Sequence, residues 1–170
     1  MLNCHTIPTM PPPRGAASVC FINDLTIIEQ AAISFLRHWG SRKTRQIVIA
    51  ELIWQLGNSE GHDGIRYLDQ IVIILSEKSR RTFLYHDIIC DCVGAHEISF
   101  AKLIYLASTE NKNDAMIFAN NLVKPPFLNE LYSVAQKFGK KLEKMIKKDH
   151  LVNLNSNITN ELTIKQLSHD

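Results

Sequence analysis

The sequence predicts an all-α fold: a compact single-domain bundle of five to six helices, with an irregular N-terminal arm and a C-terminal tail. Apolar residues recur at intervals of three and four over most of the 170-residue chain, as they do along one face of an α-helix. Glycine and proline are scarce, with seven and six residues, whereas a β-fold rich in turns needs more of both. Apolar residues make up 45% and charged residues 21%, which is typical of one globular domain.

Three regions of the chain differ in composition. Residues 1–22 contain the block Pro11–Pro13, which favours an extended polyproline conformation, so we expect a flexible arm there. Residues 23–148 carry the helical periodicity and form the expected domain. Residues 149–170 are rich in asparagine and serine and the periodicity fades, which predicts a mobile polar tail.

Helices are predicted over 26–39, 42–56, 63–79, 95–108, 113–123 and 127–147, with a short extended piece near 82–86. The first helix opens with a capping box, in which Thr26 and Glu29 pair, and Gly40 suits its end. Both tryptophans, Trp39 and Trp54, fall on the apolar stripes of the first two helices. They are therefore predicted to be buried.

The second helix has a broad apolar stripe that includes Ile47, and the polar residues 58–62 after it predict a flexible loop. The third contains the β-branched run Ile71–Leu75, for which a strand is the alternative, but apolar residues at helical spacing favour a helix. In the fourth, Glu97 lies near the positive end of the helix dipole. Residues Lys124–Pro126 end the fifth helix and start the sixth.

Charge and hydropathy limit the classes of partner and location. The net charge of +2 is too small to indicate nucleic acid or a membrane from global electrostatics. The most apolar run is far shorter than the roughly 20 residues that a membrane span needs. The N-terminus lacks the basic and apolar segments of a signal peptide. We therefore expect a location in the cytoplasm.

The four cysteines are Cys4, Cys20, Cys90 and Cys92. A disulfide framework is typical of small secreted domains, whereas a chain of this length needs no covalent support. Cys90 and Cys92 are predicted not to bond to each other, because so short a separation would strain the bond. All four are expected to be reduced.

The densest group of candidate chemical residues lies in the segment 86–97. A loop could bring His86, Cys90, Cys92 and His96 onto one zinc ion, since zinc takes four nitrogen or sulfur ligands. Such a site would be structural. Structural zinc sites usually have pairs of cysteines with about two to four residues between them, and these pairs lie well apart in the sequence. Here one residue separates Cys90 from Cys92, and both histidines lie close by. The alternative is that Cys90 packs as a small apolar residue and the histidines lie at the surface or at a helix cap.

Enzymatic chemistry has less support in the sequence. The thioredoxin-type Cys-x-x-Cys spacing differs from that of Cys90 and Cys92, and Asp87 and Asp91 would raise the pKa of a nearby thiol. A catalytic set of one Cys, one His and one Asp could be chosen from the sequence, but any chain with seven histidines offers such a choice. The sequence has no glycine-rich phosphate loop and no HExxH motif. We predict a protein that is not an enzyme and needs no cofactor, with zinc as the one alternative.

The start of the second predicted helix is the candidate contact with nucleic acid. Arg42, Lys43 and Arg45 follow a Gly-Ser turn, as basic residues do at the start of a recognition helix. The apolar body of this helix favours a core position instead, and cations at a helix N-terminus oppose the dipole. The lysines of the last helix form a further basic face, for which a solvated surface is the alternative. Basic groups gathered on one exposed face would favour DNA, whereas an exposed apolar patch would favour a protein partner.

The segment 86–97 and its flanks resemble a group of small helical proteins of alphaproteobacteria. These have three helices, a basic pair, a His, one or two Cys, a Gly or Ser, an acidic cap pair and a Leu-rich helix. The matching residues are Arg80, Arg81, His86, Cys90, Cys92, Gly94, Glu97 and Leu103. His96 departs from the pattern, because an acidic residue is expected there. The resemblance covers residues 24–146 and implies a helical fold and a bacterial cytoplasm, but no activity.

We therefore predict a non-enzymatic interaction or regulatory module of the bacterial cytoplasm, whose partner is a protein or a second copy of the chain. The alternative is a small DNA-binding regulator with a structural zinc ion. It would use the His86/Cys90/Cys92 loop for the metal and the basic start of the second helix for DNA.

Overall fold

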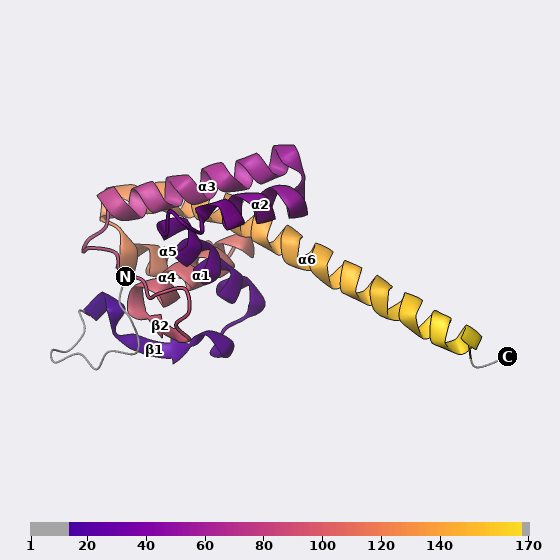
Figure 1. Cartoon of the computed structure of the whole chain (residues 1–170). Coiled ribbons are helices and arrows are strands. Elements are labelled where there is room, and N and C mark those ends of the chain that lie inside the picture. The colour runs from indigo at the N-terminus through magenta and orange to yellow at the C-terminus, as the bar shows by residue number, and fades with distance from the viewer. Residues whose placement is uncertain (1–13, 168–170) are drawn as a thin grey trace.

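The computed structural model describes the backbone of residues 14–167 and the side chains of residues 15–148. These residues form a bundle of six α-helices with one small two-stranded sheet, which confirms the predicted all-α bundle (Figure 1). The helices are α1 (Ile27–Gly40), α2 (Arg45–Leu56), α3 (Asn58–Glu77), α4 (Ala95–Ser108), α5 (Lys112–Leu122) and α6 (Leu128–Leu167). Short 3-10 turns occupy Arg14–Ala16, Ile22–Asp24 and Pro125–Phe127.

Helix α4 lies at the centre of the bundle and contacts α1, α5 and α6. Its sequence is apolar on most sides, and Phe100, Leu103 and Ile104 are fully buried, as expected for a helix without a solvent face. Phe138 of α6 packs edge-on against Phe35 of α1, with 6.3 Å between the ring centroids. Helix α6 therefore closes the core over α1 and α4.

Helices α2 and α3 form a tight hairpin that lies along the first part of α6 (Figure 1). Gly57 joins them with φ of 81°, a conformation that favours glycine. Helix α3 starts at Asn58, so the flexible loop predicted over 58–62 is wrong. Gly61 explains the error, because it does not break the helix but faces α2. A Cβ atom there would lie 2.7 Å from the Cα of Ile53.

A short antiparallel sheet ties the N-terminal segment to the start of α4. Strand β1 (Ser18–Phe21) pairs with β2 (Cys92–Gly94), and Cys20 lies opposite Val93. The irregular arm predicted over 1–22 is therefore wrong for 18–21. Of the rest of the arm, 1–13 lie outside the described residues. The pairing was not visible in the sequence because its partner strand is only three residues long.

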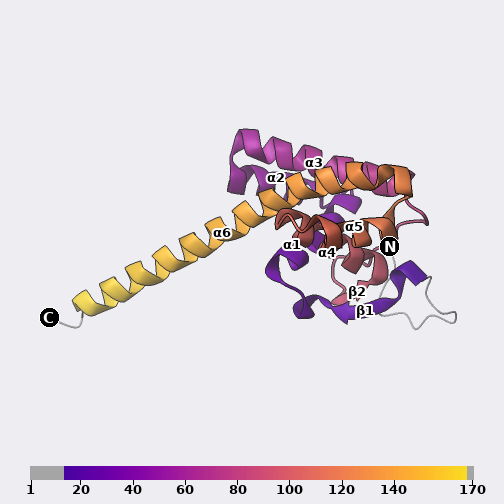
Figure 2. The ribbon, with the colours of Figure 1, turned by 180° about the vertical axis from the view of Figure 1, so that it is seen from behind.

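Helix α6 continues to Leu167, beyond the end predicted at 147. Figure 2 shows that its C-terminal part extends away from the other helices. Its backbone is helical through 149–167, most of the segment for which the composition predicts a mobile polar tail. Among the described residues, neither α6 nor any other helix combines the length and the apolar character needed to cross a membrane.

The two tryptophans have opposite environments. Trp39 on α1 is 3% exposed, which confirms its predicted burial. Trp54 on α2 is 81% exposed and Ile47 is 56% exposed, so their predicted burial is wrong. The reason is that α2 is apolar over more than one face. The core covers only the face that carries Val48 and Leu52.

Candidate functional site

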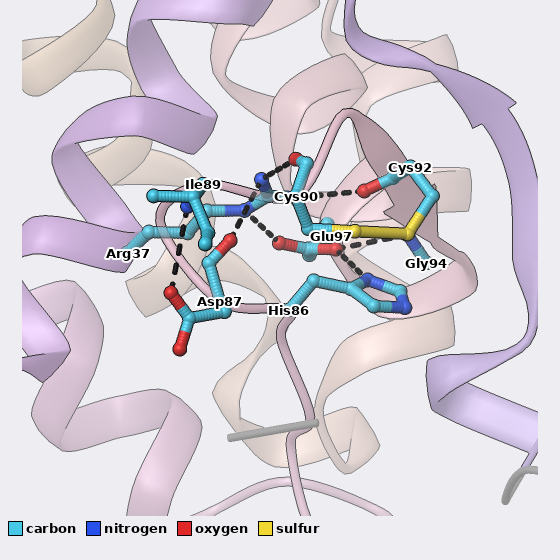
Figure 3. Close-up of polar contacts among 8 residues, drawn as sticks. All are labelled: Arg37, His86, Asp87, Ile89, Cys90, Cys92, Gly94 and Glu97. Atoms are coloured by element: carbon cyan, nitrogen blue, oxygen red, sulfur yellow. Dashed lines mark hydrogen bonds and ion pairs between the residues drawn. A yellow bond between two sulfur atoms is a disulfide. The ribbon is translucent and has the colours of Figure 1, made fainter. Parts of the chain in front are cut away.

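Arg37 on α1 holds the segment that precedes α4 (Figure 3). Its side chain is almost fully buried. Nε donates to Glu97 Oε1 at 2.6 Å. The two terminal nitrogens donate to the carbonyl oxygens of Cys90 at 2.5 Å, Cys92 at 2.7 Å and Asp87 at 3.2 Å. One guanidinium therefore fixes three backbone positions of the loop, which is the planar multiple-donor role that arginine can fill.

Glu97 is the buried counter-ion of Arg37 and also caps helix α4. Its Oε2 accepts from the backbone N–H of Gly94 at 2.9 Å and lies 2.6 Å from Nδ1 of His86. Burial alone would raise the pKa of Glu97, but hydrogen bonds from Arg37, Gly94 and His86 outweigh it and lower the pKa. The carboxylate is therefore charged at neutral pH, and Arg37 compensates that charge.

His86 is 6% exposed and packs directly over Gly94. A Cβ atom at Gly94 would lie 2.9 Å from Cε1 of the His86 ring and 3.1 Å from the carbonyl oxygen of Gly15. Glycine at this position lets the ring approach the start of α4 and bond to Glu97. His86 therefore belongs to the buried Arg37–Glu97 pair, which we call the Arg37–Glu97–His86 cluster.

Cys90 and Cys92 form a disulfide, which is drawn beside the cluster in Figure 3. The prediction that they do not bond is wrong. Their Cα atoms are 5.4 Å apart, within the range of ordinary disulfides, because Arg37 draws both carbonyl groups to one side and curls the loop. Cys20 on β1 has no disulfide, and burial, followed by the charge of Asp24, raises the pKa of its thiol. Cys4 lies outside the described residues.

His96 lies on α4 in a separate environment. Its Nδ1 accepts from the backbone N–H of Leu84 at 3.1 Å, and its ring stacks on Phe83 with 5.4 Å between centroids. Gly15 covers the other side, since a Cβ atom there would overlap the ring. Burial, and then the charge of Arg81, lower the pKa of His96. The ring is a neutral packing element that joins 83–84 to α4.

The four predicted zinc ligands do not converge on one point. The sulfurs of Cys90 and Cys92 bond to each other, His86 bonds to Glu97, and His96 bonds to Leu84. Within 15–148, no three His, Cys, Asp or Glu side chains are arranged to hold a metal ion. A zinc site at His86, Cys90, Cys92 and His96 therefore stays a prediction, and it requires the reduced loop to rearrange.

The predicted nucleic-acid residues are divided between two environments. Arg42 and Lys43 are exposed ahead of α2, whereas Arg45 lies 4.9 Å over the ring of Trp39 and donates to its carbonyl oxygen at 3.0 Å. The lysine face of α6 lies at the opposite end of α2, where Lys148 donates to the carbonyl oxygen of Gln55. Twelve helical residues span about 18 Å. The two basic groups therefore do not form one surface.

The residue pattern did not indicate that Arg37 pairs with Glu97, and it indicated only the helix-terminal role of Glu97. Glu97 was placed at the helix N-terminus, but its partner lies 60 residues away in the sequence. A signal was present, because Arg37 interrupts the apolar stripe of α1 beside Ile33 and Leu36. Charged residues are rarely buried without a partner, so a charge on a core face indicates a buried ion pair.

A small cavity of about 390 Å³ opens beside the disulfide, between α1 and the loop. Arg37, His38 and Cys90 are among the residues that line it. Nδ1 of His38 is itself buried and has no hydrogen-bond partner among the described residues. The cluster and its surroundings thus combine a fixed loop, a disulfide and one unsatisfied histidine nitrogen.

Comparisons of the chain with protein-family models, with curated proteins and with solved structures found no match. The resemblance to small helical alphaproteobacterial proteins therefore stays a prediction.

Proposed function

We propose that this protein is a non-enzymatic interaction module that binds a protein partner through the exposed face of α2. The observation that carries the proposal is Trp54, whose side chain is 81% exposed on a helix that buries Val48 and Leu52 in the core. Tryptophan is enriched at the centres of protein interfaces. Ile47, 56% exposed, lies on the same side of α2, so the exposed apolar side chains are grouped there. The buried charged groups of the Arg37–Glu97–His86 cluster bond to each other and to the backbone, which suits a structural clamp.

Four of the exposed residues of α2 form one stripe, which we call the α2 face: Ile47, Ala50, Glu51 and Trp54. Gln46 is the fifth exposed residue of the helix. The spacing of Ile47, Ala50 and Trp54 is i, i+3, i+7, as on helices that dock through apolar anchors. On the opposite side of α2, Val48 and Leu52 are buried in the core. The α2 face is therefore held on a rigid support, so little ordering entropy is lost when a partner covers it.

A second copy of the chain fits the α2 face best. Two copies of α2 packed antiparallel about a two-fold axis between Ala50 and Glu51 would place Ile47 of each copy against Trp54 of the other. The same patch then serves both subunits, as an isologous interface requires. Ala50 and Glu51 both lie at the centre, with Ala50 of each copy opposite Glu51 of the other, and the small side chain of Ala50 leaves room for that carboxylate.

The bacterial cytoplasm is the location that we propose, on the composition of the chain. Reducing conditions there would act on the Cys90–Cys92 disulfide. The α2 face contains neither cysteine, so the proposed interaction does not depend on the state of that bond.

Light scattering after size-exclusion chromatography over a range of concentrations tests the proposal. We expect the full chain to form a dimer and Trp54→Ala to raise its dissociation constant by at least about 30-fold, as for truncation of an interface tryptophan. Ile117→Ala is the matched control, because Ile117 is 61% exposed on α5 and remote from the α2 face. A chain that stays monomeric at all concentrations would contradict self-association.

A further inference from the structure

A pocket of about 620 Å³ opens between the end of α1, the start of α2, the C-terminal half of α3 and the segment 80–85. This volume lies within the range of sites that hold small organic molecules. It lies apart from the Arg37–Glu97–His86 cluster, and neither Ile47 nor Trp54 of the α2 face lines it.

The floor of the pocket is apolar. Leu36 of α1, Val72 and Leu75 of α3, and Phe83 of the segment 80–85 line it. Leu36 and Leu75 are themselves buried in the core, so the floor is fixed by the packing of the bundle. An apolar body that entered the pocket would cover this surface and displace water from it.

The rim of the pocket is basic. Arg45, Arg80 and Arg81 line it together with hydroxyl side chains, and the lining includes no Asp or Glu. Arg80 is held in place, since Nε donates to the carbonyl oxygen of Val123 at 3.0 Å and Nη2 donates to Oδ1 of Asn120 at 2.5 Å, which leaves Nη1 for a ligand. Arg45 is held by its stacking on Trp39. These two guanidinium groups are positioned in advance, while Arg81 is exposed beside them.

The segment 80–85 is tied down on both sides. The backbone N–H of Arg80 donates to the carbonyl oxygen of Leu122 at 3.1 Å. At the other end, the hydroxyl group of Tyr85 lies so close to Gly40 that a Cβ atom there would overlap it. The wall of the pocket therefore has anchors at both ends and does not depend on a ligand for its shape.

We propose that this pocket binds a small organic acid, with its carboxylate at the three arginines and its apolar body on the floor. Arginine binds carboxylates through paired hydrogen bonds, and an apolar cavity with a few convergent polar groups is the usual form of a ligand site. A fatty acid and an aromatic acid share this chemistry.

Isothermal titration calorimetry of the full chain with dodecanoate, below its micellar concentration, tests the proposal. We expect saturable binding of one molecule per chain. Arg81→Gln should weaken binding about tenfold, as for loss of one charge-assisted hydrogen bond at a partly exposed site. Arg42→Gln is the matched control, because Arg42 is also exposed but does not line the pocket, and its effect should stay within about twofold. Dodecyltrimethylammonium carries the same chain with the opposite charge and should not bind.

A second variant separates the pocket from general attraction to basic residues. Ser76 lines the pocket and is exposed, so Ser76→Trp should fill the space without disturbing the core and should abolish binding. Equal binding of the ammonium compound, or unchanged binding by both Arg81→Gln and Ser76→Trp, would overturn the proposal. The proposal would also be overturned if the chain sedimented with phosphatidylglycerol vesicles but did not bind monomeric dodecanoate.

Discussion

At the scale of single residues, the contacts of Arg37 decide how the chain around the disulfide is placed. Its guanidinium meets the carboxylate of Glu97 and the carbonyl groups of the loop inside the protein. Among the described residues, no lysine and no second arginine pairs with Glu97. A buried charge that loses its partner is far more costly than a pair removed together. The cluster therefore behaves as one unit.

Replacing Arg37 with methionine should destabilise the protein by about 3–5 kcal/mol, because the carboxylate of Glu97 would remain buried and uncompensated. The double variant Arg37→Met with Glu97→Gln should recover part of this loss. Urea unfolding followed by circular dichroism measures both. Arg42→Met, at an exposed position, should change stability by less than about 0.5 kcal/mol. A cost for Arg37→Met as small as that of the control would show that the cluster is not a clamp.

Stability should fall as the pH falls, in two steps. The folded pKa of His96 is lowered, so the unfolded chain binds more protons, and stability declines as the pH drops below the ordinary histidine value of 6.5. The folded pKa of Glu97 is also lowered, so its contribution is present above 4.5 and is lost as the pH falls through the folded value. His96→Asn keeps an acceptor for Leu84 but does not titrate. Unfolding free energies at several pH values should show that the upper step alone disappears in this variant.

At the scale of elements, helical periodicity predicted most helix boundaries to within a few residues. It failed where one residue had a role that depends on its neighbour in space. Glycine is common in loops, yet Gly61 lies within α3 where this helix touches the backbone of α2. Arg37 and Glu97 each fit their own helix, but local patterns cannot show that the two helices bring them together. Strand β1 exists only through its pairing with β2.

Gly61→Ala should destabilise the hairpin of α2 and α3. Alanine normally favours a helix over glycine by up to about 1 kcal/mol. Here the added methyl group would lie 2.7 Å from the Cα of Ile53 and 2.8 Å from the carbonyl oxygen of Leu52, so the helices must separate. We expect a net cost of about 1–3 kcal/mol in thermal unfolding. Ser59→Ala, exposed on the same turn, should be neutral, and a stabilising Gly61→Ala would contradict the close contact.

The disulfide should contribute less than the ion pair beside it. It closes a loop with one residue between the cysteines, for which the entropic stabilisation is about 1–2 kcal/mol. The double variant Cys90→Ser with Cys92→Ser should lose no more than this in urea unfolding.

Elemental analysis of the reduced wild-type chain after incubation with zinc then tests the predicted metal site. Stoichiometric zinc that the double variant does not retain would support the site, and its absence from both proteins would reject it.

At the scale of the whole molecule, the bundle presents an apolar face on α2 that its own core does not use. Lysines of α6 are paired with acidic groups, as Lys144 is with Glu60 at 2.6 Å, so much of the basic surface is compensated within the chain. The α2 face differs, because Ile47 and Trp54 stand exposed on a helix that the core holds rigidly on its other side. We propose that a second copy of the chain covers this face.

Cross-linking through Ala50 tests that claim most directly. In the antiparallel pair the two copies of Ala50 lie beside the two-fold axis, at the separation at which cysteines can bond. In a chain that carries Cys4→Ser and Cys20→Ser, Ala50→Cys should yield a covalent dimer rapidly under mild oxidation. Ile117→Cys in the same background should stay monomeric. Equal cross-linking of the two variants, or none by Ala50→Cys at concentrations where the wild-type chain is dimeric, would contradict the account.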